Sequence, residues 1–73
     1  MPPGYSNNQT HNSAQNQAEL VRQNAVAAAG GNAAALRSAA IAYHQSVARS
    51  AIQNGVSPQV NFQALRELGL TGV

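Results

Sequence analysis

Few side chains in this 73-residue sequence could act as nucleophiles, acid–base groups or metal ligands. There is no cysteine, the carboxylates are Glu19 and Glu67, and the histidines are His11 and His44. A zinc site needs a cluster of four ligands, and acid–base catalysis needs paired groups in a shaped pocket. The best catalytic combination is His44 with either glutamate, but a histidine beside an apolar helix stripe is usually structural. We therefore expect no enzyme, no metal site and no cofactor.

The arginines are the remaining side chains with a recognisable chemistry, because guanidinium groups clamp phosphates. Arg37, Arg49 and Arg66 are the candidate nucleic-acid contacts. Arg37 and Arg49 are twelve residues apart, which separates them by about 120° around an ideal helix. Since they do not share a face, four dispersed arginines give weak, salt-sensitive binding at most. A small nucleic-acid-binding or regulatory protein is the alternative interpretation.

Composition favours a protein that packs against other protein chains. Charged residues make up 8% of the sequence, whereas about a quarter is usual. Alanine supplies fifteen of the hydrophobic residues, so large apolar side chains are few. A domain of this size buries only about 60% of the surface that its unfolded chain exposes. Without disulfides, homo- or hetero-oligomerisation is the expected source of extra stability.

The first half of the chain reads as a tail followed by a helix. Residues 1–12 are rich in Pro, Ser, Asn and Gln, which predicts an extended polar tail. Ser13 is a candidate N-cap for a helix that ends at the adjacent Gly30 and Gly31. We place a single small helical domain at residues 13–73.

Two more helices are expected in the second half. Asn32 is a candidate N-cap for a second helix that runs to about Asn54 and closes at Gly55. Ser57 followed by Pro58 then predicts a short third helix that runs to about Leu68 and stops at Gly69.

Apolar side chains recur at helical spacing in the second and third helices. We predict that these side chains form a protein interface consisting of Leu36, Tyr43, Val47, Phe62, Leu65 and Leu68. The alternative is that the third helix folds back on the second and closes the core of the chain itself.

The predicted fold is all-α: two alanine-rich helices joined at Gly30 and Gly31, a short C-terminal helix and an extended N-terminal tail. The first two helices are either hairpinned or continuous as one broken rod. The predicted function is a non-enzymatic structural or accessory subunit of a larger assembly. Low charge and abundant Asn, Gln and Ala suit a minor bacteriophage virion component from the capsid, neck, tail or interior. No signal peptide or transmembrane segment is visible, so we expect a virion or cytoplasmic location.

Overall fold

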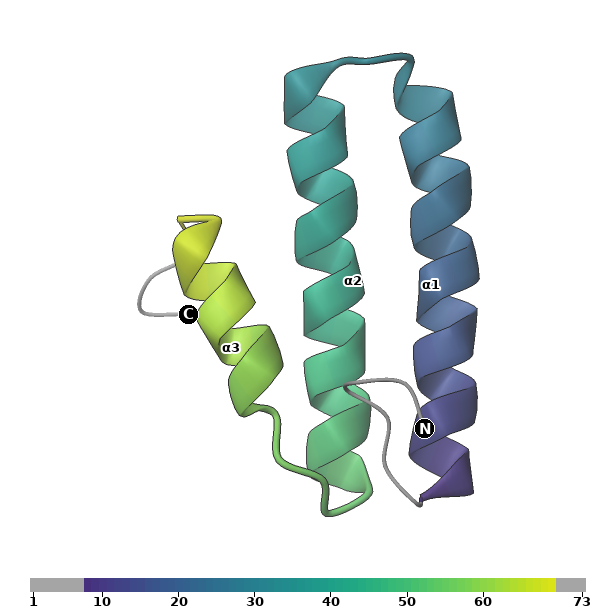
Figure 1. Ribbon diagram of the computed structural model, residues 1–73, viewed down its shortest axis with the longest axis vertical. Helices are drawn as coiled ribbons and strands as arrows, with labels where there is room; N and C mark the ends of the chain where they lie inside the picture. The colour runs from purple at the N-terminus through teal and green to yellow at the C-terminus, as the bar shows by residue number, and fades with distance from the viewer. Residues whose placement is uncertain (1–7, 70–73) are drawn as a thin grey trace.

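A computed structural model describes residues 8–69, which form three α-helices: α1 (Gln9–Ala29), α2 (Ala33–Gln53) and α3 (Gln59–Glu67). No strand occurs in this part of the chain, and helices make up 82% of it. The all-α prediction is therefore confirmed. Helices α1 and α2 form an antiparallel hairpin, and α3 turns back along the other side of α2 (Figure 1).

The start of α1 lies five residues before its predicted position. Asn8, not Ser13, is the N-cap, and its side-chain oxygen accepts a hydrogen bond of 2.9 Å from the His11 amide. The helix extends this far because Asn8 is an equally good cap and because His11 and Gln15 are buried within the described fold. Residues 1–7 of the predicted tail lie outside the described residues.

The two glycines between α1 and α2 make a tight reversal, not a continuation of one rod. Gly30 and Gly31 have φ angles of 57° and 85°, which side chains other than glycine rarely adopt. Asn32 then caps α2, and its side-chain oxygen accepts a hydrogen bond of 2.9 Å from the Ala35 amide. This local chemistry fixes the hairpin.

The segment from Asn54 to Pro58 connects α2 to α3. Asn54 is the C-cap of α2 and Gly55 follows with φ 71°, close to the predicted end. Pro58 is the N-cap of α3 and not its first residue, and no side chain caps this helix. The third helix thus begins one residue later than its sequence suggests.

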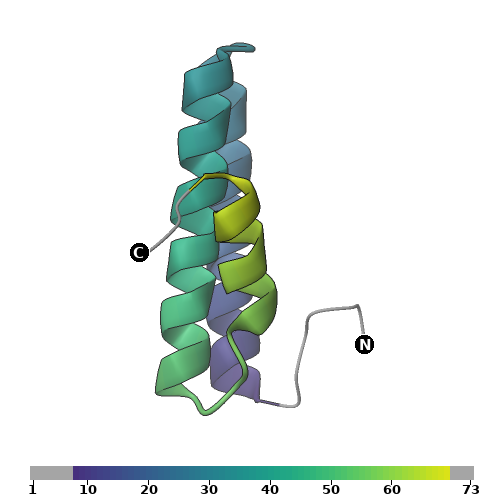
Figure 2. The ribbon, with the colours of Figure 1, turned by 90° about the vertical axis from the view of Figure 1, so that its left-hand side faces the viewer.

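The three helices form a layer one helix thick. Both α1 and α3 contact α2, and among the described helices they do not contact each other. The Cα trace measures 35 × 27 × 18 Å, and Figure 2 shows α3 offset to one side of α2. Because this three-helix layer is one helix thick, both of its faces are incompletely covered by other helices. Within residues 8–69 no helix is long and apolar enough to cross a membrane.

The core is small and built largely from alanine. Its buried apolar residues are Ala39, Val47, Ala48, Ala51 and Leu65. No large side chain of the described residues is fully buried. Several large apolar side chains lie on the outside instead, namely Leu20, Val21, Val26, Ile52, Val60 and Phe62. This distribution is unusual, because side chains of these types are normally the ones that build a core.

Candidate protein-interaction surface

The predicted interface residues divide into two groups in the structure. Val47 and Leu65 are only 2% and 8% exposed, so they belong to the core of the chain itself. They are not available to a partner in this conformation, and the third helix folds back on the second as the alternative prediction had it. Phe62 is exposed, whereas Leu36, Tyr43 and Leu68 are half-buried. Of these six residues, only Phe62 is therefore exposed in this conformation.

Two polar contacts hold α3 against α2. Nδ1 of His44 lies 2.9 Å from Oδ1 of the buried Asn61, which places a hydrogen bond between the two helices. Nε of Arg37 donates to the carbonyl oxygen of Leu68 at 3.0 Å, and its Nη2 donates to the same atom. The carbonyl belongs to the C-cap of α3, where a cation also offsets the negative end of the helix dipole.

A second polar cluster joins the start of α1 to the end of α2. Nδ1 of the buried His11 lies 3.0 Å from Oγ of the buried Ser50. The side-chain Nδ2 of Asn54 donates to the backbone carbonyl of Ser50 at 2.8 Å, and the side-chain Nδ2 of Asn8 donates to the backbone carbonyl of Asn54 at 3.1 Å. His11 was predicted to lie in the tail, so this cluster was missed. The i, i+4 spacing of His11 and Gln15 was the available signal, but no apolar stripe accompanied it.

A cation–π contact joins α1 to α2 nearer their middle, beside an ion pair within α1 and a ring contact within α2. Nε of Arg22 donates to Oε2 of Glu19 at 3.0 Å, and the guanidinium carbon lies 5.9 Å from the centroid of the Tyr43 ring. The hydrogen bond from Arg22 lowers the pKa of Glu19, and the same bond raises the pKa of Arg22. The Tyr43 and His44 rings meet edge to face, with centroids 5.0 Å apart. Arg22, Glu19 and His44 thus serve contacts within the fold.

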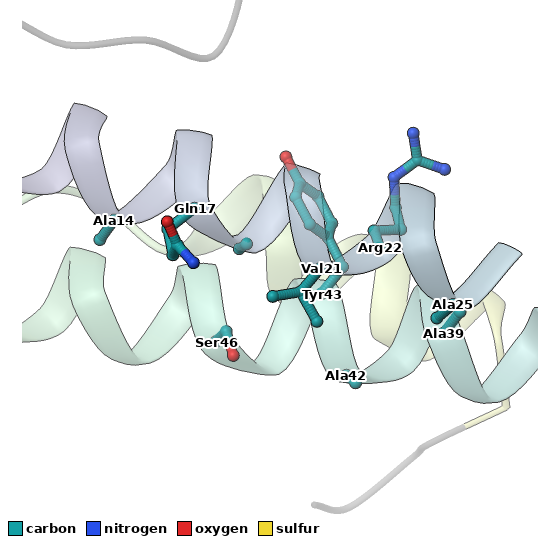
Figure 3. A pocket seen from close by; sticks show the side chains of 10 residues that line it. Ala14, Gln17, Val21, Arg22, Ala25, Ala39, Ala42, Tyr43 and Ser46 are labelled. Atoms are coloured by element: carbon teal, nitrogen blue, oxygen red, sulfur yellow. The ribbon is translucent and has the colours of Figure 1, made fainter. Parts of the chain in front are cut away.

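A shallow groove of about 330 Å³ lies between α1 and α2. Alanines of both helices form much of its lining, together with Val21 and Tyr43 (Figure 3). Figure 3 also shows the Arg22 and Tyr43 side chains pointing to the same side. Because no carboxylate or histidine lines this groove, it holds no acid–base pair. Among residues 8–69, no three potential metal ligands come together.

The candidate nucleic-acid contacts lie on two neighbouring helices, with Arg37 and Arg49 on α2 and Arg66 on α3. Arg37 is exposed but engaged with the end of α3, whereas Arg49 and Arg66 are exposed on different helices. The fourth arginine, Arg22, is paired with Glu19.

Residues 8–69 thus form three packed helices that leave several large apolar side chains exposed. Comparison with known proteins returned no match: no family model fits the chain, and neither a curated protein nor a solved structure matches it significantly.

Proposed function

We propose that this protein is a non-enzymatic structural or accessory subunit of a larger protein assembly. The observation that carries the proposal is the placement of its large apolar side chains. Leu20, Val21, Ile52 and Val60 are each more than half exposed, whereas Val47 and Leu65 are the only large aliphatic side chains in the described core. Exposed apolar side chains that form a contiguous patch mark sites of protein contact, and in the proposal another chain covers these four.

Simple energetics agree with this role. Burying one aliphatic side chain contributes about 1.5–3 kcal/mol, and an alanine contributes much less. In the isolated chain, most of the large aliphatic side chains that could supply the greater stabilisation remain exposed to water. Its 8% charged residues also provide little of the like-charge repulsion that keeps soluble monomers apart. Covering the exterior with another chain would supply the stability that the small core lacks.

A bacteriophage particle is one assembly that suits this composition, and the nucleic-acid alternative has less support than an assembly role. Low charge and abundant Asn, Gln and Ala are the basis for naming a virion. Arg22 and Arg37 already have partners in the fold, which leaves two exposed arginines on different helices for phosphate.

Light scattering combined with circular dichroism tests the proposal on the full chain. The test variant replaces Leu20, Val21, Ile52 and Val60 with Gln, which removes apolar surface and preserves helix propensity. The matched control replaces four exposed amides, Asn24, Gln45, Gln53 and Gln63, with Ala. We expect the parent chain and the control to form helical oligomers and the test variant to lose association. A parent chain with little helix when alone would indicate folding on a different partner.

A stable helical monomer at every concentration, equally soluble with and without its exposed apolar side chains, would show that the proposal is wrong. Replacing Arg49 and Arg66 with Ala provides the separate check on the alternative. Salt-sensitive retention of nucleic acid by the parent, lost in this variant, would favour nucleic-acid binding.

A further inference from the structure

Helix α3 is attached to the rest of the fold through one neighbour. Among the described helices it contacts α2 and does not touch α1 (Figures 1 and 2). Its only covalent link to the hairpin is the short segment 54–58. Moving α3 away would therefore leave the α1–α2 contacts, including the His11–Ser50 hydrogen bond, in place.

In the single chain, α3 itself packs on the surface of α2 that lies beneath it. Leu65 is buried there, His44 lies 2.9 Å from Asn61, and Arg37 donates to the Leu68 carbonyl. None of these contacts depends on α3 belonging to the same chain. The α3 of a second copy would make the same set of contacts with this α2.

The connecting segment 54–58 contains a glycine and a single turn at which the chain could change direction. Gly55 has φ 71°, and the turn is closed by a hydrogen bond of 2.8 Å from the Val56 amide to the Ala51 carbonyl. On either side of this segment lie Ile52 and Val60, which are 61% and 71% exposed. When two copies exchange an element, their hinge segments run beside each other. Exchange of α3 would thus cover apolar side chains that the single chain leaves in water.

We propose that α3 is an exchangeable arm, which one copy of the chain places on α2 of a second copy. The inference rests on the proposed assembly role and names the partner as another molecule of the same chain. Exchange preserves every α2–α3 contact and adds the contact around Ile52 and Val60. A high local concentration of the protein favours the exchanged form, because in that form the α2–α3 contacts join two molecules.

Complementary charges at one contact test the exchange directly. One full-length variant carries His44→Lys with Asn61→Lys, and the other carries His44→Asp with Asn61→Asp. In each variant alone, like charges oppose docking of α3 on any copy of α2, and we expect no dimer. In an equimolar mixture each arm meets an opposite charge on the other variant. We expect a complex of twice the 7.5 kDa mass of one chain.

The matched control places both partners of the new ion pair in one chain, His44→Asp with Asn61→Lys. It should associate as the parent does and keep α3 protected from hydrogen exchange. Failure of the two variants to combine, with this control folded, would overturn the exchange. If the parent still formed oligomers, assembly through other surfaces would stand.

Hydrogen exchange of the parent chain provides an independent readout that needs no variant. Under the proposal the turn opens in the dimer, so the Val56 amide, which bonds the Ala51 carbonyl in the single chain, should lose protection at high concentration and regain it on dilution, while α1 and the first half of α2 stay unchanged. Protection of the Val56 amide that is the same at all concentrations, or a parent that is monomeric at all concentrations, would show that α3 stays on its own α2.

Discussion

The two helix–helix interfaces of this protein are built on different principles. The α1–α2 interface joins two 21-residue helices through small side chains and is closed at one end by the buried His11–Ser50 hydrogen bond. The α2–α3 interface involves a helix of nine residues, one buried leucine and two polar contacts. The first interface distributes its stability over a long contact, whereas the second concentrates it at Leu65, Asn61 and Arg37.

This difference predicts two levels of stability within one small fold. A contact distributed over many alanines loses little when one of them changes, but a nine-residue helix has almost no intrinsic stability in water. Helix α3 should therefore open locally while the α1–α2 hairpin stays folded. Substitutions in the two interfaces should separate these events.

The largest effect is expected for Leu65→Ala. Truncation of a buried leucine costs about 2–5 kcal/mol, which exceeds what the two polar contacts can restore. Hydrogen exchange should show loss of protection across α3 with the hairpin still protected. Phe62→Ala is the matched control, because Phe62 is 39% exposed and its truncation should release α3 much less. Simultaneous loss of protection in α1 would contradict the independence of the two interfaces.

The second effect compares the two histidine contacts. His11→Ala should lower the free energy of unfolding of the hairpin by about 1–3 kcal/mol, since it leaves the buried Ser50 hydroxyl without this partner. His44→Ala should cost about 0.5–1.5 kcal/mol and act on α3, because His44 is half-buried and water can replace it. Urea unfolding followed by circular dichroism measures the first, and hydrogen exchange of α3 measures the second. If each substitution destabilised the hairpin and α3 equally, the two interfaces would not unfold separately.

The helix ends illustrate what the sequence alone could provide. The helix end at Gly30 and Gly31, the cap at Asn32 and the stop at Gly55 were predicted because each depends on residues within one helical turn, whereas the choice between a hairpin and a broken rod was left open. The start at Asn8 was missed, since both Asn8 and Ser13 are acceptable caps and the choice depends on packing. Local signals leave such choices to the tertiary structure.

The buried face of each helix was harder to predict than its ends. Alanine fits both buried and exposed positions, so the sequence of an alanine-rich helix indicates only weakly which side faces the core. His11, Gln15 and Asn61 are buried, whereas Leu20 and Val60 are exposed, which reverses the usual rule. For this reason the apolar spacing on α2 and α3 was recognised, but it did not show that Val47 and Leu65 are buried within this chain.

A third prediction concerns Gln15, which lies on α1 of the longer interface. Its Oε1 atom is buried without a hydrogen-bond partner, an arrangement that costs free energy. Gln15→Met keeps a similar shape and removes this acceptor, so it should stabilise the hairpin by about 1 kcal/mol. Gln17→Met at an exposed position of the same helix is the control and should change thermal stability little. A destabilised Gln15 variant would mean that its amide nitrogen makes the more important contact.

The smallest effect is expected from the partly exposed Glu19–Arg22 pair within α1. The hydrogen bond from Arg22 lowers the pKa of Glu19 in the folded chain. A carboxyl with a lowered folded-state pKa stabilises the fold above its unfolded-state pKa, and this contribution disappears as pH falls through the folded-state pKa. Glu19→Gln should therefore remove a small, salt-sensitive part of the stability loss on acidification. Glu67→Gln makes the same formal charge change on α3, where no described ion pair is lost, and should leave the acid dependence of the hairpin as it is. Urea titrations from neutral to acid pH would measure both, and a larger change for Glu67→Gln would show that the acid response of the protein belongs to α3 and not to the hairpin.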